Sequence, residues 1–169
     1  MPTARHVLIV EDDAAIRGLL EDLLREDGCS VALARGGAEA LALMRGRRPD
    51  LVLLDLMLPD IDGWTFLKLR ERERALADVP VLVISAAGPA GVRRAQELGA
   101  PIFLAKPFNL DEVLVKVRRL CSGPVRQCAW CGQVVDDAGE FRLRSERKLR
   151  WATHGICPTC KEAESRALV

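Results

Sequence analysis

The residue that could do the most chemistry in this sequence is Asp55, which directly follows the apolar run Leu51–Leu54. Four consecutive large apolar residues are typical of a strand that is buried on both faces in the middle of a parallel sheet. A carboxylate at the end of such a strand is costly to bury unless a metal ion or hydrogen-bond donors meet it. Because open α/β sheets bind ligands at the carboxyl ends of their strands, we expect Asp55 to lie in a functional site.

Other polar side chains also stand at the ends of predicted strands. They are Asp12 and Asp13 after the apolar run 6–10, Ser85 after 81–84, and Lys106 after 102–105. If these strands are neighbours, the side chains converge on one edge, where crowded carboxylates would raise a pKa or require a divalent cation. Mg²⁺ prefers such oxygen ligands, and a lysine and a hydroxyl beside it suit phosphoryl transfer.

The elements that must position these side chains alternate regularly along the chain. Apolar residues from Ile16 to Leu24 recur at helical spacing, and Gly28 is a helix stop signal. A weaker strand at 31–34, nearer a sheet edge, comes next. Further helices are predicted over 38–44, 64–72, a segment ending at Leu98, and a last helix capped by Asn109. Five alternations of strand and helix predict an α/β fold with a doubly wound parallel sheet.

Residues 5–120 resemble the receiver domain of two-component response regulators. The resemblance is carried by Asp12-Asp13, Asp55, Ser85, Lys106-Pro107, and by Pro59 and Gly63 in the loop after Asp55. It implies a flavodoxin-like (βα)5 domain over residues 1–122, in which Asp55 accepts a phosphoryl group. It also implies that Asp12, Asp13, Asp55 and the backbone carbonyl of Met57 bind Mg²⁺.

The resemblance also implies roles for the remaining side chains. Lys106 would hold a phosphoryl oxygen or pair with Asp55, and Ser85 would be a switch hydroxyl drawn toward the phosphoryl group. Phe103 occupies the aromatic switch position, and the Lys106–Pro107 bond is expected to be cis. The phosphoryl donor would be a sensor histidine kinase or a phosphotransfer protein. The output would be contact with an unknown downstream protein through the face of the fourth helix, fifth strand and fifth helix, a face that could also form a homodimer.

Simpler interpretations exist for single residues. Asp12 could be only a helix cap, Lys106 a surface lysine, and Phe103 is as compatible with ordinary core packing as with a moving switch. Trp64 and Phe66 are most simply explained by helix packing. Met57 and Ala87 lie two residues after Asp55 and Ser85. The resemblance implies that the side chains at these two positions flank the path of the water that hydrolyses the aspartyl phosphate. Because neither side chain can orient water, we expect a long-lived phosphoryl group.

A second group of residues lies in the last part of the chain. Cys128 and Cys131 form one Cys-x-x-Cys pair, Cys157 and Cys160 form another, and 25 residues separate the two. Paired motifs of this kind are the signature of a tetrahedral four-cysteine Zn²⁺ site. We expect residues 123–127 to be a linker and 128–169 to be a zinc-ribbon-like module. So short a segment cannot bury enough apolar core to fold alone and needs a bound metal ion to stabilise it.

The alternation of apolar and basic residues at 141–144 and 149–151 predicts a β-hairpin with one apolar face inside this module. The motif His154-Gly155-Ile156-Cys157-Pro158 resembles a small module at the ends of bacterial signalling proteins, a resemblance that supplies no activity. A redox-active Cys-x-x-Cys pair and a nucleic-acid finger are the alternatives. The first normally needs a strand before it and a helix after it, and the second a basic face.

Composition narrows the function class. The chain has 169 residues, a net charge of +1, a 49% hydrophobic content and no signal-peptide-like or membrane-spanning run. We therefore expect a cytoplasmic protein that binds neither membrane nor DNA, since no helix-turn-helix pattern follows Leu120. The tail is too short for an effector enzyme. A phosphohydrolase of related fold remains an alternative, although its acidic nucleophile usually follows the first strand.

Overall fold

The computed structural model describes residues 4–98, 100 and 102–121, together with four short strands of the C-terminal region. Helices and strands alternate through the first part of the chain as the sequence predicts. The elements of this part are β1 (His6–Val10), α1 (Ala14–Glu26), β2 (Ser30–Ala34), α2 (Gly37–Gly46), β3 (Leu51–Leu54), α3 (Gly63–Arg72), β4 (Val81–Ser85), α4 (Pro89–Glu97), β5 (Ile102–Ala105) and α5 (Leu110–Cys121).

The five strands form one parallel sheet in the order β2-β1-β3-β4-β5. The chain thus winds outward from β1 in both directions, which is the doubly wound flavodoxin-like topology expected from the sequence. β3 lies at the centre and β2 at an edge, as its weaker apolar pattern indicates. All four residues of β3 are buried, which agrees with an apolar run covered on both faces.

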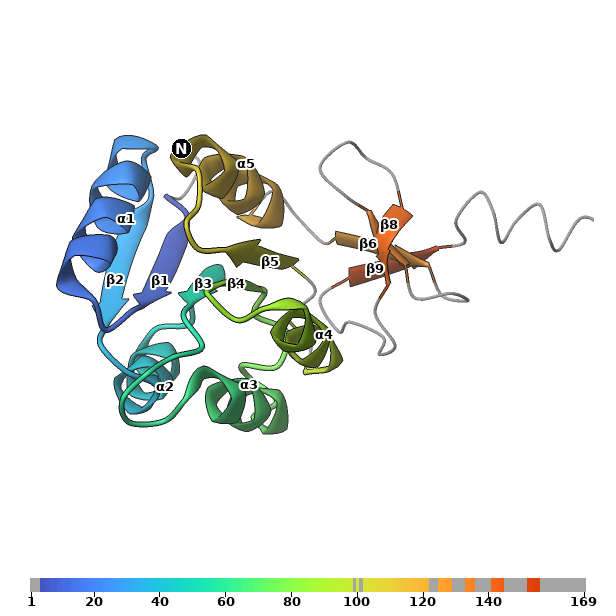
Figure 1. Ribbon diagram of the computed structural model, residues 1–169, viewed down its shortest axis with the longest axis horizontal. Coiled ribbons are helices and arrows are strands. Elements are labelled where there is room, and N and C mark those ends of the chain that lie inside the picture. Colours follow the sequence, from blue (N-terminus) through green and yellow to red (C-terminus); the bar gives the residue numbers. More distant parts are fainter. Residues whose placement is uncertain are drawn as a thin grey trace, which may run out of the picture.

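Helices cover both faces of the sheet, with α1 and α5 on one side and α2, α3 and α4 on the other (Figure 1). Alternate residues of each strand enter different cores. Val7 and Ile9 pack with residues of α1 and α5, whereas Leu8 and Val10 pack with residues of α2 and α3. The two cores hold the sheet rigid, so the carboxyl ends of β1, β3 and β5 have fixed relative positions.

Helix ends follow the sequence signals. Asp13 caps α1 by accepting hydrogen bonds from the backbone N–H groups of Ala15 and Ile16, and Gly28 ends that helix with a φ of 80°. Asn109 accepts a hydrogen bond from the N–H of Asp111 at the start of α5, at 2.7 Å. Asn109 is thus the cap that the sequence predicts for α5, whereas the cap of α1 is Asp13 and not Asp12.

The C-terminal strands form a second sheet. They are β6 (Val125–Cys128), β7 (Gln133–Val135), β8 (Phe141–Arg144) and β9 (Ala152–Gly155), in the order β8-β7-β6-β9. β6 begins inside the stretch 123–127 that the sequence suggested as a linker. The strand at 141–144 forms and pairs with β7 in antiparallel fashion, and the segment 149–151, predicted as the other strand of a hairpin, lies outside the described residues.

Of the four cysteines predicted to bind Zn²⁺, one lies in the second sheet, at the end of β6. Only the backbone of Cys128 is described, and Cys131, Cys157 and Cys160 lie outside the described residues. No helix within the described part of the chain is long and apolar enough to cross a membrane.

Candidate functional site

The candidate site lies where β1, β3 and β5 end. The register pairs Val10 with Leu54 and Ser85 with Ala105, so the residues that follow these pairs leave the sheet at the same edge. Glu11 and Asp12 follow β1, Asp55 follows β3, and Lys106 follows β5. The Lys106–Pro107 peptide bond is cis, as expected. The sheet topology therefore brings together residues that are up to 95 positions apart in the sequence.

Lys106 stands between two buried carboxylates. Its Nζ donates a hydrogen bond to Oδ2 of Asp55 at 2.5 Å and another to Oε2 of Glu11 at 2.7 Å. Asp55 is 6% exposed and Glu11 is 3% exposed, so both contacts are largely shielded from water. Carboxylate oxygens of Glu11, Asp12 and Asp55 all lie within 4.8 Å of one another. One ammonium therefore faces a group of three acidic side chains.

The pKa directions show how this group is balanced. Burial disfavours the charged form of Asp55, but hydrogen bonds from Lys106 and from the N–H of Met57 outweigh it and lower the pKa of Asp55. For Glu11 burial dominates, and it raises the pKa of the carboxyl despite the bond from Lys106. Burial also works against the charged Lys106, yet its two carboxylate partners raise the pKa of its ammonium. Asp55 is thus kept ionised, as a nucleophile must be.

Three clustered carboxylates fit a divalent cation that takes oxygen ligands, and Mg²⁺ is such a cation. Asp12 is exposed and Asp55 is buried, so a cation held by both would have solvent on one side and the buried carboxylate on the other. The arrangement can hold a metal beside an ionised carboxylate with a lysine opposite, a set of groups that can stabilise negative charge developing next to Asp55.

The structure divides the acidic run differently from the sequence-based expectation. Asp13 does not join the group, because its Oδ1 accepts hydrogen bonds from the N–H groups of Ala15 and Ile16 at 2.8 and 3.0 Å. These bonds are also the main reason why the pKa of Asp13 is lowered. Glu11, which sequence reasoning missed, takes the inner position. The signal was present, because an aspartate directly before a helical pattern is a helix-cap signal.

Ser85 lies at the end of β4 and is fully buried. Its Oγ makes no hydrogen bond to any atom of the residues that the structure describes. A buried hydroxyl without a partner costs free energy and invites an acceptor. The Ser85 hydroxyl is therefore free to donate a hydrogen bond to an acceptor oxygen that comes within its reach.

Met57 and Ala87 differ in their surroundings. The N–H of Met57 donates a hydrogen bond to Oδ1 of Asp55 at 3.0 Å, while its side chain is 67% exposed. Ala87 is partly buried and packs against the core beneath α2, α3 and α4. Both side chains are apolar, and Ala87 lines the same pocket as Phe103.

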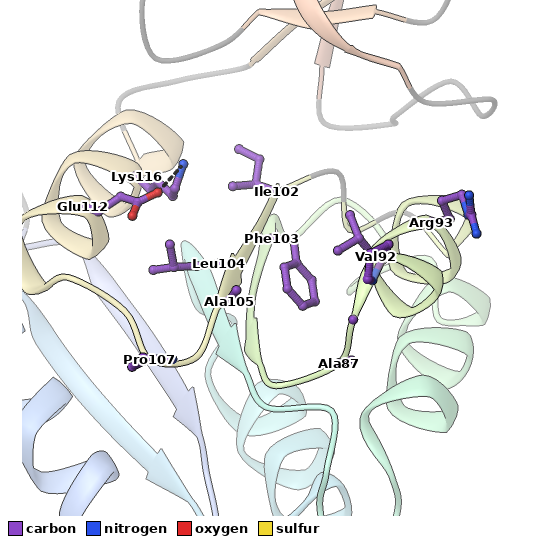
Figure 2. A pocket seen from close by; sticks show the side chains of 12 residues that line it. Ala87, Val92, Arg93, Ile102, Phe103, Leu104, Ala105, Pro107, Glu112 and Lys116 are labelled. Atoms are coloured by element: carbon purple, nitrogen blue, oxygen red, sulfur yellow. Dashed lines mark ion pairs between the residues drawn. The ribbon is translucent and has the colours of Figure 1, made fainter.

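Phe103 lies on a different surface, where α4, β5 and α5 meet. Its side chain points from β5 toward α4, whereas that of Leu104 points toward α5 (Figure 2). The ring is partly buried and lines a pocket of about 750 Å³ together with Val92, Ala87 and Lys116. Space beside the ring means that Phe103 is not enclosed by core packing alone.

Comparison with known proteins identifies the family. Residues 7–118 match the family model of the response regulator receiver domain. The chain belongs to the response regulator receiver family. It is therefore related to signalling proteins of two-component systems, and its (βα)5 fold and acidic site are those of a receiver domain.

Individual relatives agree with this assignment. The chain is similar to the DNA-binding dual master transcriptional regulator RpaA of Synechocystis sp., with 39% identity over 116 residues that cover 68% of this chain and 48% of RpaA. It is also similar to response regulator MprA of Mycobacterium sp., with 41% identity over 116 residues, 68% of this chain and 50% of MprA. The structure of the chemotaxis response regulator CheY4 of Vibrio cholerae matches with a TM-score of 0.66 and 29% identity, covering 70% of this chain and 99% of CheY4.

These relatives correct one expectation. The sequence was expected not to bind DNA, but a protein as similar as RpaA is a DNA-binding transcriptional regulator, so that expectation is wrong. It rested on the absence of a helix-turn-helix pattern after Leu120 and on a nearly neutral net charge. The chain spans about half the length of the curated relatives it matches, and their DNA binding is a property of those longer proteins.

Proposed function

We propose that this chain is a response regulator that accepts a phosphoryl group on Asp55 from the phosphohistidine of a sensor histidine kinase or a phosphotransfer protein. The observation that carries the proposal is a cluster of three carboxylates. Oxygens of Glu11, Asp12 and Asp55 lie within 4.8 Å of one another, and Lys106 donates hydrogen bonds to Glu11 and Asp55. Asp55 is the one member that is buried, ionised and placed at the end of the central strand.

In the proposed transfer, an oxygen of Asp55 forms a bond to phosphorus while the bond from phosphorus to the histidine nitrogen breaks. The nitrogen keeps the electron pair of that bond and then takes a proton. The ammonium group of Lys106 exchanges its hydrogen bond with Asp55 for one with a phosphoryl oxygen, and it offsets the negative charge of that oxygen. Mg²⁺, held by Asp12, Asp55 and the backbone carbonyl of Met57, would neutralise further charge on the phosphoryl oxygens; Glu11 replaces Asp13 in this proposal as the inner acidic residue.

The phosphorylated Asp55 presents new acceptor oxygens to Ser85, whose hydroxyl has no partner among the described residues. If Ser85 moves inward, the space that it leaves lets Phe103 turn into the fold, which changes the surface formed by α4, β5 and α5. The pocket of about 750 Å³ beside Phe103 supports this role, because a contact surface with free space can change shape. We propose that this surface transmits the signal by protein contact.

The test is to incubate the chain with a small phosphodonor, with and without Mg²⁺, and to measure covalent phosphate. We expect about one labelled site per chain with Mg²⁺, none with Asp55→Asn, and slower labelling with Lys106→Met. Catalytic release of phosphate from many small substrates, without a stable label, would instead support the phosphohydrolase alternative. The protein would then be an enzyme rather than a signalling protein that only phosphorylates and dephosphorylates itself.

For the tail we propose a structural Zn²⁺ site formed by Cys128, Cys131, Cys157 and Cys160. The support is the parallel pairing of β6 with β9, in which Cys128 lies opposite Gly155. Each Cys-x-x-Cys motif therefore begins within two residues of the end of one of two neighbouring strands. The chain spans at most about 3.6 Å per residue, so the two motifs are within reach of one metal ion.

The zinc proposal is tested by metal analysis of the purified chain. We expect one Zn²⁺ per chain, lost in Cys157→Ser, and free thiols under non-denaturing conditions only after chelation. A chain without metal whose Cys-x-x-Cys pairs are oxidised would support the redox alternative instead.

A further inference from the structure

The loop between β3 and α3, residues 55–62, makes a polar contact that the proposed function does not use. Oδ1 of Asp60 accepts a hydrogen bond from the N–H of Gly37 at 2.9 Å, and Oδ2 accepts one from the N–H of Ala38 at 3.1 Å. Both donors belong to the first turn of α2. The loop that carries the phosphoacceptor is therefore tied to a helix that has no part in the site.

The contact serves α2 as well as the loop. The first N–H groups of a helix have no partner within it and need outside acceptors. The N-cap residue of α2 is Gly36, which has no side chain to provide one. Burial alone would raise the pKa of Asp60, but the bonds from Ala38 and Gly37 lower it, so the side chain meets the helix as a carboxylate.

The two glycines before and at the start of α2 leave room for this contact. A Cβ atom at Gly36 would lie 2.2 Å from Oδ1 of Asp60, and one at Gly37 would lie 2.5 Å from the carbonyl oxygen of Ile61. Both distances are too short for any side chain. Serine, threonine, aspartate or asparagine would cap α2 locally, but here each would push the loop away.

The two ends of the loop are held by contacts other than the hydrogen bonds between Asp60 and α2. Its start is fixed by the bond from the N–H of Met57 to Asp55 and by the buried side chains of Leu56 and Leu58. Its end is fixed by the N–H of Gly63, which donates to the carbonyl oxygen of Leu56 at 3.0 Å. Between Leu58 and Gly63, Pro59 and Asp60 are exposed and Ile61 is partly buried. The carboxylate of Asp60 supplies the side-chain hydrogen bonds that join this stretch to α2.

We propose that Asp60 is a positioning residue for the magnesium site. By bonding to α2 it holds the loop so that the backbone of Met57 stays where the metal site needs its carbonyl oxygen. The inference rests on the proposed function, because it assumes that this carbonyl is a ligand. Residues that orient metal ligands without touching the metal typically contribute at least about tenfold to metal affinity.

The test measures Mg²⁺ affinity by calorimetry on the full chain, and separately the labelling of Asp55 at saturating Mg²⁺. We expect Asp60→Ala to bind Mg²⁺ about tenfold more weakly, with labelling restored when Mg²⁺ is saturating. Asp60→Asn keeps one acceptor oxygen for α2 and should retain most of the affinity. Gly36→Ala should weaken binding as Asp60→Ala does, because its methyl group would occupy the place of the carboxylate.

Glu39→Ala is the matched control. Glu39 lies in the first turn of the same helix and accepts a hydrogen bond from the N–H of Arg35 at 2.8 Å, a contact within the segment that leads into α2. We expect it to lower the melting temperature without changing Mg²⁺ affinity. If Asp60→Ala and Gly36→Ala each lower the melting temperature but leave the Mg²⁺ affinity unchanged, Asp60 only caps α2 and the inference is wrong. A wild-type chain that binds no Mg²⁺ would overturn the proposed function itself.

Discussion

At the scale of single residues, the site is a problem of charge balance. Lys106 supplies one positive charge to Glu11 and Asp55, both of which are buried, and Asp12 adds a third carboxylate at the rim. Burial raises the pKa of Glu11, whereas at Asp55 the hydrogen bonds from Lys106 and the N–H of Met57 outweigh burial and lower the pKa. A divalent cation would remove the remaining imbalance.

The first prediction follows from this imbalance. Mg²⁺ should raise the melting temperature of the wild-type chain, because a ligand that binds only the folded state stabilises it by about 2.7 kcal/mol at a hundred times its Kd. Asp12→Asn should abolish this shift. Asp13→Asn is the control, since asparagine also caps helices and Asp13 bonds α1 rather than the acidic group. Loss of the shift in Asp13→Asn, with the shift retained in Asp12→Asn, would reverse our assignment.

The second prediction concerns the lifetime of the phosphoryl group. Met57 and Ala87 lie two residues after Asp55 and Ser85 and carry no group that could orient an attacking water. We expect Met57→Asn combined with Ala87→Glu to shorten the lifetime of phospho-Asp55 by at least about tenfold, in the range of positioned acid–base groups. The decay of labelled protein after removal of the phosphodonor measures it. Equal decay in wild type and variant would show that these side chains do not control hydrolysis.

The acidic run shows what the sequence could and could not predict at this scale. That acidic side chains meet Asp55 and Lys106 was predictable, because parallel strands bring their carboxyl ends to one edge. Which of Glu11, Asp12 and Asp13 enters the site was not, since it depends on where β1 ends and α1 begins. The helix begins at Ala14, so the side chain before it is used as a cap.

At the scale of elements, helices α1 and α5 are joined by a charged contact at their ends. Arg118 of α5 donates hydrogen bonds to Asp27 at the end of α1, one of them from Nε at 3.0 Å, and Arg5 pairs with the same carboxylate at 3.5 Å. The hydrogen bond from Arg118 is the main reason why the pKa of Asp27 is lowered.

The third prediction uses this shift. A carboxyl whose pKa is lowered by folding stabilises the folded state above its unfolded pKa, and that contribution is lost as the pH falls through the lowered value. Arg118→Gln should therefore reduce the free energy of unfolding at neutral pH, but not at a pH below the lowered pKa of Asp27. The contact is largely exposed, so the loss should be small and should shrink further in high salt. Denaturant unfolding at both pH values measures it, and a pH-independent loss would contradict the assignment.

The fourth prediction compares two glycines within helices. A Cβ at Gly91 of α4 would lie 2.5 Å from that of Ala87 and 3.6 Å from the ring of Trp64, whereas a Cβ at Gly18 of α1 would meet nothing within 4 Å. Alanine is favoured over glycine in a helix by about 1 kcal/mol, and overpacking costs about 1–3 kcal/mol. Gly18→Ala should therefore stabilise the chain and Gly91→Ala should not, as thermal unfolding would show. A stabilising Gly91→Ala would mean that α4 moves away at little cost.

At the scale of the whole molecule, the first sheet was predictable and the second was not. Strands β1, β3 and β4 are apolar runs long enough to be recognised alone, and the order of a doubly wound sheet follows from right-handed crossovers. The strand Phe141–Arg144 was also predictable from its alternation. Its partner β7 was not, because an alternating pattern identifies a strand but not the strand that pairs with it.

The last prediction tests the independence of the two sheets. Glu11, Asp55, Ser85 and Lys106 all lie within the first sheet or directly after its strands, and the two sheets share no strand. A chain that ends at residue 122 should therefore fold and be labelled on Asp55 with unchanged dependence on Mg²⁺. Removal of metal from the full chain by a chelator, followed by replacement of Mg²⁺ alone, should give the same result.

Two outcomes of that comparison carry different meanings. If the shortened chain unfolds, the first sheet needs the second for stability, and the two cores on either side of β1 and β3 are insufficient on their own. If it folds but is labelled much faster than the full chain, the C-terminal segment restrains the site in the unphosphorylated protein. Equal rates would place the role of the Cys-rich segment after phosphorylation rather than before it, because it would then have no influence on the transfer to Asp55.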